Sequence, residues 1–405
     1  MRYKPYPKYK DSGVEWLGDV PENWKQSYLK HVSNINMGQS PSSKNYNVEG
    51  LGIEFLQGNA DFGIINPTAR TFTTEIKKVA NINDILFTVR APVGAMNIAN
   101  KKYAIGRGLC AISSNEKSKN SFLWWLMPVV TIELNMVATG STYESVTIEQ
   151  VNNLQLELPP LKEQTQIATY LTQKTKKIDT LIEKQQTLIK LLKEKRQALV
   201  DKALNEDDIK SIRIDKVINK IYRPVYRDKN KTYTTLGLYN RGRGLFHREP
   251  KVEDELGESD FYWVEDGDLI LSGQFAWEGA IALAKKDENI TIVSHRFPIV
   301  RGKKNILNTE YLWAFFTTQL GNFILNEHSV GSAGRNRPLN MNTLVKEKIP
   351  LPSMEAQMKV AKVVQIEQLL HVKINKEIAL LKERRVALVS AVVGGKVDVR
   401  EWEVN

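Results

Sequence analysis

The feature of this chain that most constrains its fold is an internal repeat of two long helical segments. Each segment begins with a similar proline-led run, and the matching residues Gln164 and Gln357 lie 193 residues apart. Further along, the run 192–200 matches the run 381–389 at a separation of 189 residues. The second segment is therefore shorter by four residues, which is close to one helical turn of about 3.6 residues. Two paired helices can differ by one turn without rotating their apolar faces far.

Apolar residues in both segments recur at intervals of four and three, which is the pattern of a coiled-coil seam. The predicted apolar seam positions are Ile167, Leu171, Ile178, Leu181, Leu188, Leu192 and Leu199 in the first segment, and Val360, Val363, Leu370, Ile374, Leu381 and Leu388 in the second. The seam is predicted to be interrupted by polar residues at Lys174, Gln185 and Lys195 in the first segment and at Glu367, Glu377 and Arg384 in the second. Neither helix would be stable alone, so each is the expected partner of the other. The alternative is an ordinary hairpin of two core helices. Because the segments lie so far apart in sequence, globular domains must be connected to them.

The regions that precede the two segments also resemble each other. Residues 83–90 correspond to 267–272, each a turn acid followed by a buried strand. Residues 122–126 parallel 311–316 as a short aromatic helix that is expected in the core. We therefore predict an α+β protein formed by tandem duplication. Its expected parts are a globular domain at 1–156, a long helix at 157–211, a second globular domain at 212–348, and a second long helix with a C-terminal tail at 349–405.

Composition and charge narrow the class of protein. The 405 residues exceed one ordinary core, and 57 Lys and Arg against 46 Asp and Glu give a net charge of +11. This charge favours an anionic partner such as nucleic acid, although many basic proteins bind no polyanion. The single cysteine, Cys110, excludes a disulfide framework and a cysteine-based zinc site. With no secretory-signal pattern and no apolar run long enough to cross a bilayer, a cytoplasmic protein without a membrane partner is expected.

The sequence contains no recognisable motif for catalysis. It has no phosphate-binding loop ending in Gly-Lys-Ser or Gly-Lys-Thr, no Gly-x-Gly-x-x-Gly after a strand, and no Pro-Pro-Tyr or Pro-Pro-Phe methyltransferase loop. Glu75 and Lys77 have the spacing of a nuclease pair, but no partner aspartate precedes them, which favours a solvated strand edge. The five histidines never fall at metal-ligand spacing. We therefore predict a protein that binds rather than reacts, with no catalytic residues, no metal site and no cofactor of its own.

Several loop residues have the chemistry to contact DNA. The loop 37–44 offers amide, hydroxyl and ammonium donors, and the runs 240–248 and 331–337 place arginines beside glycines. Arginine to guanine is the commonest specific contact, which makes 240–248 the strongest local signal. The candidate DNA-contacting residues are Gln39, Ser40, Ser42, Ser43, Lys44, Arg90, Arg107, Arg241, Arg243, Gln274, Arg296, Ser332, Arg335 and Arg337. The alternative for these residues is a solvent loop or, for the matching pair Arg107 and Arg296, a structural ion pair.

Runs spread along the whole chain are typical of one protein family. They are the proline-led run 158–164, the helix end 193–200, the second copies of both, and the N-terminal runs 11–18 and 21–24. Through them the chain resembles the DNA-specificity subunit of a type I restriction–modification enzyme. In the second copy of the proline-led run, Ser353 and Ala356 replace a proline and a glutamate, so that copy departs from the pattern.

The resemblance implies a function in DNA recognition. Each globular domain would be a target recognition domain that reads one half of a bipartite site in double-stranded DNA. The two helices would form an antiparallel coiled coil that sets the spacing between the half-sites and docks two modification subunits. Those subunits would use S-adenosylmethionine to methylate a flipped adenine. Restriction subunits that use ATP and magnesium would complete the complex.

Two other classes of protein remain open at this point. A coiled-coil scaffold without sequence-specific DNA binding would show no salt-dependent affinity for DNA. An autonomous methyltransferase–nuclease would need a cofactor loop that the sequence lacks, and binding of S-adenosylmethionine by the isolated chain would support it.

Overall fold

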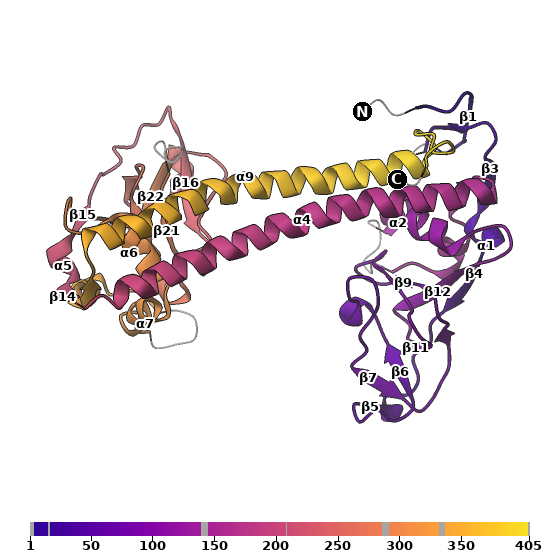
Figure 1. The fold of residues 1–405 in the computed structure, drawn as a ribbon, viewed down its shortest axis with the longest axis horizontal. Coiled ribbons are helices and arrows are strands. Elements are labelled where there is room, and N and C mark those ends of the chain that lie inside the picture. Colours follow the sequence, from indigo (N-terminus) through magenta and orange to yellow (C-terminus); the bar gives the residue numbers. More distant parts are fainter. Residues whose placement is uncertain are drawn as a thin grey trace. The chain divides into compact units, whose positions relative to one another are not determined.

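The computed structural model divides the chain into two compact units. It describes residues 4–14, 17–138, 145–207, 209–285, 291–331 and 337–403. The first unit comprises Met1–Ile182 with Ala379–Asn405, and the second comprises Glu183–Ile378. Each unit therefore contains one globular part and a portion of each long helix (Figure 1).

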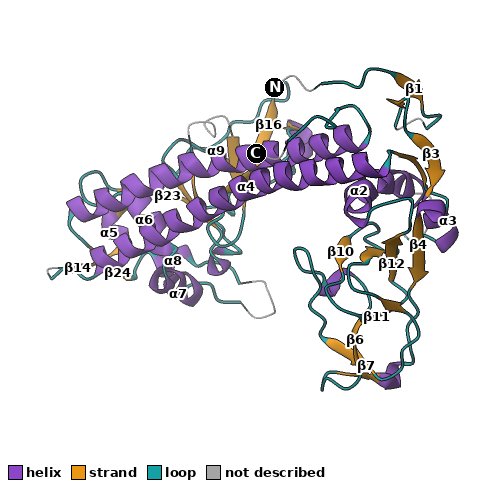
Figure 2. Ribbon diagram, turned by 45° about the vertical axis from the view of Figure 1, so that its right-hand side comes forward, coloured by secondary structure: helices purple, strands orange, loops and turns teal. Residues whose placement is uncertain are grey.

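The globular part of the first unit contains a four-stranded and a five-stranded sheet, besides two two-stranded pairs (Figure 2). The strands of one sheet are, in order, β10 (Met96–Ile98), β9 (Ile85–Thr88), β12 (Leu109–Ser114) and β4 (Ser33–Met37). The strands of the other are β5 (Tyr46–Asn47), β7 (Thr71–Thr73), β6 (Ile53–Leu56), β11 (Tyr103–Ile105) and β8 (Val79–Ala80). Strand β11 is parallel to β6 and antiparallel to β8.

The second unit repeats the first of these sheets strand for strand and most of the second sheet. Its first sheet is β21 (Ile281–Leu283), β20 (Leu269–Leu271), β23 (Ile299–Gly302) and β15 (Ile218–Ile221). Its second sheet is β17 (Leu245–His247), β16 (Thr232–Leu238), β22 (Thr291–Ser294) and β19 (Phe261–Trp263), with β18 (Lys251–Val252) also paired to β16. Strand β22 is parallel to β16 and antiparallel to β19, as β11 is to β6 and β8. The tandem duplication predicted from the sequence is thus present in the order and direction of the strands.

The turn acids predicted before the central strands make equivalent hydrogen bonds in the two units. The carboxylate of Asp84 accepts the backbone N–H of Asn81 at 2.7 Å just before β9. The carboxylate of Asp268 accepts that of Glu265 at 2.8 Å just before β20. Each acid closes a turn that leads directly into a buried strand.

The two long helices are α4 (Leu161–Leu204, 44 residues) and α9 (Met354–Val393, 40 residues), so the second is shorter by the predicted four. In the second unit, the amide of Gln185 donates to Glu377 and the guanidinium of Arg196 donates to Glu367. The later residue of α4 thus pairs with the earlier residue of α9, so the two helices are antiparallel. The predicted fold class is confirmed. None of the helices in the described ranges is long and apolar enough to cross a membrane.

The seam of the coiled coil differs in part from the predicted one. Leu181 and Leu188 were predicted to lie in it but are 49% and 40% exposed. The inward-facing positions of α4 are instead Leu171, Thr175, Ile178, Ile182, Gln185, Ile189, Leu192, Arg196 and Leu199. These follow a strict alternation of four and three. Leu181 and Leu188 are each followed by an isoleucine, Ile182 and Ile189, that is just as apolar, so hydrophobicity alone does not decide which neighbour faces the partner helix. Gln185, which was predicted as a polar interruption of the seam, does lie in it.

A buried glutamine connects the start of each long helix to the start of a shorter helix. The amide of Gln164 donates to the carbonyls of Pro159 and Lys117 at 2.9 and 3.1 Å, and its oxygen accepts the N–H of Lys119 at 2.9 Å. Residue 119 immediately precedes α2 (Asn120–Ala138). The bonds satisfy two carbonyls and one N–H in the segments that lead into the two helices.

Gln357 makes the equivalent three bonds in the second unit. Its amide donates to the carbonyls of Pro352 and Ile306 at 3.0 and 3.3 Å, and its oxygen accepts the N–H of Asn308 at 2.8 Å. Asn308 is the N-cap of α6 (Thr309–Phe316). The repeated glutamine in the sequence therefore has a structural cause.

The structure also explains why the second proline-led run has Ala356 where the first has Glu163. In the first copy, Glu163 is 4% exposed and accepts hydrogen bonds from Tyr6, Asn23 and Trp24 of the N-terminal segment. The second unit places Ala356, which is 8% exposed, at the matching position against an apolar cluster. A carboxylate there would be buried in apolar surroundings, which is costly for a charged group.

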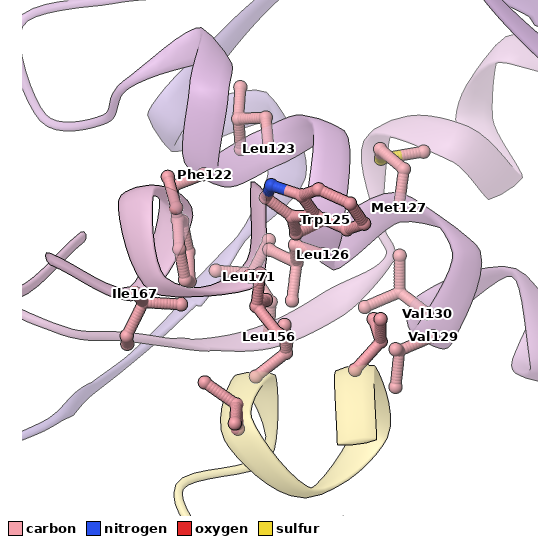
Figure 3. Packing of buried hydrophobic residues seen from close by; sticks show 14 of the residues in the cluster. Phe122, Leu123, Trp125, Leu126, Met127, Val129, Val130, Leu156, Ile167 and Leu171 are labelled. Atoms are coloured by element: carbon pink, nitrogen blue, oxygen red, sulfur yellow. The ribbon is translucent and has the colours of Figure 1, made fainter. Parts of the chain in front are cut away.

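The aromatic helices are part of the core, as predicted. In the first unit, Phe122 and Leu126 of α2 are buried in a cluster with Ile167 and Leu171 of α4 and with Leu156 of β13 (Gln155–Leu158) (Figure 3). In the second unit, every residue of α6 from 311 to 316 is buried. The long helices are thus anchored to the globular parts by apolar packing.

Candidate nucleic-acid interface

Equivalent loops follow the central strands of the two sheets in each unit. In the first unit, the N–H of Val89, which precedes the candidate Arg90, donates to the carbonyl of Gly108 at 3.0 Å. In the second unit, the N–H of Gly273, which precedes the candidate Gln274, donates to the carbonyl of Arg296 at 2.7 Å. The loops after β9 and β11, and those after β20 and β22, are therefore held together in the same way.

The polar loop of the first unit packs against the loop that carries Arg107. The N–H of Gln39 donates to the carbonyl of Ile105 at 2.9 Å, and the N–H of Arg107 donates to the hydroxyl of Ser40 at 3.1 Å. A Cβ on Gly38 would lie 2.2 Å from the carbonyl oxygen of Gly106, so only glycine permits this approach. Gln39, Ser40 and Arg107 are thus brought together, although they are distant in sequence.

The remaining residues of this loop are held by a carboxylate that the sequence did not indicate as a support. Glu75 accepts the N–H of Ser42 at 3.2 Å and the amide of Asn45 at 2.6 Å, and it forms an ion pair with Lys77 at 2.5 Å. Lys77, then Ser42 and Asn45, lower the pKa of Glu75 to about 2. Glu75 therefore holds the short helical turn η1 (Ser43–Asn45) in place. The pair of Glu75 and Lys77, whose spacing resembles that of a nuclease motif, supports this loop.

A hollow of about 440 Å³ lies at the matching strand ends of the second unit. Its polar lining includes Gln274 and Arg296, which were candidates, and Arg248 and Glu278, which were not. Its apolar lining consists of Phe246, Phe275 and Phe297 with Gly237 and Leu238. A groove with both forked cationic donors and carboxylate and amide groups can hydrogen-bond the edges of base pairs.

The arginine-rich run of the second unit forms a tight hairpin between β16 and β17. Arg241 and Gly242 have φ values of 60° and 61°, which is the pattern of a type I′ turn. The guanidinium of Arg243 donates to the carbonyl of Asn240 at 3.0 Å and lies 5.3 Å from the ring of Tyr239. A second hollow of about 760 Å³, lined in part by Arg241, lies beside the hairpin.

The last group of candidates is placed only in part. Arg337 donates to the carbonyl of Ser329 at 3.0 Å and lies 5.0 Å from the ring of Trp277, so its side chain is engaged within the domain. Ser332 and Arg335 lie outside the described residues. Among those residues, no group of three histidine, cysteine, aspartate or glutamate side chains is placed to hold a metal ion.

Comparison with known proteins identifies the family. The model of the type I restriction modification DNA specificity domain matches this chain twice, at residues 21–191 and 206–380. Two similar curated proteins, both from Methanocaldococcus jannaschii, are named as type I restriction enzyme specificity subunits, MjaX and MjaIX. MjaX is 41% identical over 174 residues, which cover 41% of this chain and 39% of that protein. MjaIX is 24% identical over 167 residues, which cover 38% of this chain and 39% of that protein.

A solved structure shows the same fold along nearly the whole chain. The crystal structure of the S subunit of a type I restriction–modification system from M. genitalium superposes with a TM-score of 0.54 at 16% identity. The superposition covers 91% of this chain and 96% of that one. With two copies of the family model, the duplicated strand topology and the paired long helices, the chain belongs to the type I restriction modification DNA specificity family.

Proposed function

We propose that this chain is the subunit that selects the DNA target of a type I restriction–modification complex, each globular domain reading one half of a bipartite site. The observation that carries the proposal is the repeated domain. Two units with the same strand order present polar and cationic loops at the same strand ends. The loops themselves differ: hydroxyls and amides dominate the first, and arginines dominate the second. Different donors select different bases, so the two half-sites differ in sequence.

The long helices are proposed to dock the modification subunits. Outside the seam, the first unit exposes Leu181 and Leu380, at 49% and 55%. The second unit exposes Leu188, Leu191 and Leu369, at 40%, 54% and 73%. Apolar side chains on helices that already have a partner favour a further helical partner, because burying them releases water. One such surface in each unit supports two modification subunits per chain.

The chemistry of the complex is proposed to lie in the partner subunits. This chain is a specificity subunit and not an enzyme. The modification subunits would bind S-adenosylmethionine and methylate adenine at N6, and the restriction subunits would use ATP and magnesium. The site of action would be cytoplasmic DNA.

Mapping N6-methyladenine in a host that expresses this chain with its modification subunits tests the proposal. We expect methylation within a motif of two short defined parts separated by undefined bases, and we expect salt-dependent binding of the complex to that motif. Absence of both would support the scaffold alternative. Turnover of S-adenosylmethionine by the purified chain alone would contradict the proposal that the partner subunits carry out the chemistry.

A further inference from the structure

Arg241 has a backbone conformation that arginine rarely adopts. Its φ of 60° lies in the left-handed region, where glycine and asparagine are the usual residues. Such a conformation persists only where the surroundings impose it, and it is found mainly at functional sites. The type I′ turn of this hairpin would form more easily with asparagine at this position.

The surroundings of Arg241 do impose this conformation. Its N–H donates to the carbonyl of Glu278 at 2.8 Å, and the N–H of Gly242 donates to the carbonyl of Gly279 at 2.7 Å. The side-chain amide of Asn240 also donates to the carboxylate of Glu278. The hairpin is therefore attached to the segment 276–279 by hydrogen bonds, and the direction of the Arg241 side chain is fixed at its Cα.

The two arginines of the hairpin differ in what their side chains do. Arg243 bonds Asn240 and stacks on Tyr239, so it stabilises the hairpin itself. Arg241 is exposed, and within the described part of the chain its guanidinium has neither a hydrogen bond nor an ion pair. It lines the hollow of about 760 Å³, whose other lining residues are Asn240, Arg243, Trp277, Glu278 and Asn322. A fixed backbone with an unengaged forked donor is suited to a ligand outside the chain.

We propose that Arg241 reads a guanine in the major groove of the half-site bound by the second domain. This inference rests on the proposed function. A two-stranded hairpin fits the major groove, and the guanidinium can donate two bonds to O6 and N7 of guanine. A phosphate contact needs no strained backbone, because a long cationic side chain reaches phosphates from many positions. The corresponding connection between β6 and β7, residues 57–70, contains a single arginine, Arg70. Its guanidinium donates to the carbonyl of Ala60 at 3.3 Å and lies 3.7 Å from the carboxylate of Asp61, so it is engaged within the first domain. We therefore expect the effect of Arg241 to be confined to one half-site.

The variant Arg241→Asn separates reading from folding, because asparagine suits the left-handed conformation. In the complex with modification subunits, we expect an unchanged or higher melting temperature and about a tenfold or greater loss of affinity for the target. We also expect the methylated motif to become degenerate at one G·C pair of one half-site. Replacing that guanine with 7-deazaguanine, which lacks N7, should weaken binding of the wild type but not of Arg241→Asn.

Two further variants act as controls. Arg241→Lys keeps the charge but not the fork, so it should retain the salt dependence and lose the preference for guanine. Arg243→Ala should lower the melting temperature, because it removes the bond to Asn240 and the contact with the ring of Tyr239. An unchanged motif in Arg241→Asn, or a loss of affinity that is equal for all sequences, would overturn the inference. Absence of any sequence-defined methylation by the wild type would instead contradict the proposed function.

Discussion

Gln164 and Gln357 each satisfy two carbonyls and one N–H in the segments that lead into the helices. Replacing Gln164 with alanine removes one buried and two partly buried hydrogen bonds, and a buried group left without a partner costs about 1–3 kcal/mol. We therefore expect Gln164→Ala to lower the free energy of unfolding by about 2 kcal/mol or more, measured by urea denaturation. The exposed Gln186 on the same helix is the matched control, and its change to alanine should have an effect below about 0.5 kcal/mol. Equal effects of the two changes would contradict this account.

Glu75 gives the polar loop of the first domain a pH dependence. Lys77, Ser42 and Asn45 lower its pKa from 4.5 to about 2. Because the folded-state pKa is below the unfolded-state value, the contribution to stability is complete above pH 4.5 and is lost as the pH falls through 2. We expect the difference in melting temperature between the wild type and Glu75→Gln to be constant from about pH 8 to about pH 5 and to shrink below that. A difference that increases with acidity would show that Glu75 has another role.

At the scale of elements, the coiled coil contains a buried ion pair. Arg196 and Glu367 are 11% and 8% exposed and 2.9 Å apart, and Arg196 also lies 4.7 Å from the ring of Trp313. Burial raises the pKa of Glu367 despite its partner, and Nε of Arg196 is buried without a hydrogen bond among the described residues. The cost of removing both groups from water is therefore large compared with their attraction.

Single and double substitutions of this ion pair should therefore change the free energy of unfolding differently. Arg196→Met alone should cost about 3–5 kcal/mol, because it leaves a buried carboxylate unpaired. Arg196→Met with Glu367→Leu should be neutral or more stable than the wild type. The exposed pair of Lys190 and Glu194 on α4 is the control, since Lys190→Met should change the free energy of unfolding by less than about 0.5 kcal/mol. A double variant as unstable as the single one would mean that the pair is a net source of stability.

The sequence was more informative about helices than about strands. The repeat, the four-residue difference in length and the buried aromatic helices follow from local patterns, which are visible within a few turns. The seam was displaced at Leu181 because Leu181 and its neighbour Ile182 are equally apolar, and only the pairing with α9 decides which of them faces inward. The strand order depends on pairings between residues far apart in the chain, which no local pattern specifies.

The candidate site could be predicted only in part from the sequence. Loop composition indicated the polar loop of the first domain and the arginine run of the second. It could not indicate Glu75, which supports that loop from a distance of 30 residues in sequence or more. It also could not distinguish Arg241 from Arg243, because the difference lies in the φ angle and in the contacts of each side chain.

At the scale of the whole molecule, most of the net positive charge lies on the two long helices. Helix α4 carries ten Lys and Arg against five Asp and Glu, and α9 carries seven against four. The two helices thus hold eight of the eleven net positive charges. Salt-dependent DNA binding must then depend on individual cations of the globular domains more than on the net charge.

Arg107 and Arg296 are such cations, and they follow equivalent strands in domains that would read different bases. A residue shared by two different readers suits a phosphate, which is the same at every position. We expect Arg296→Gln to weaken binding equally for all sequences and to reduce the slope of log affinity against log salt by about one. Titrations of the complex at several salt concentrations measure this. A change of the methylated motif in this variant would assign Arg296 to base reading instead.

The length of the helices is proposed to set the spacing of the half-sites. Four residues inserted after Gln185 lengthen α4 by about 6 Å, at about 1.5 Å per residue. At about 3.4 Å per base pair, this corresponds to one or two base pairs. The insertion interrupts the seam by nearly one turn, which a coiled coil accommodates by local unwinding, and α9 is already four residues shorter than α4.

We therefore expect this variant to methylate a motif with both half-sites unchanged and a spacer that is longer by one or two base pairs. The matched control is an insertion of the same four residues after Asn230, in the exposed turn that precedes β16, which should leave the spacer as it is. Mapping the methylated motif of each variant measures the spacer directly. An active variant with an unchanged spacer would mean that the globular domains set the distance, since the helix would have grown without moving the sites that are read.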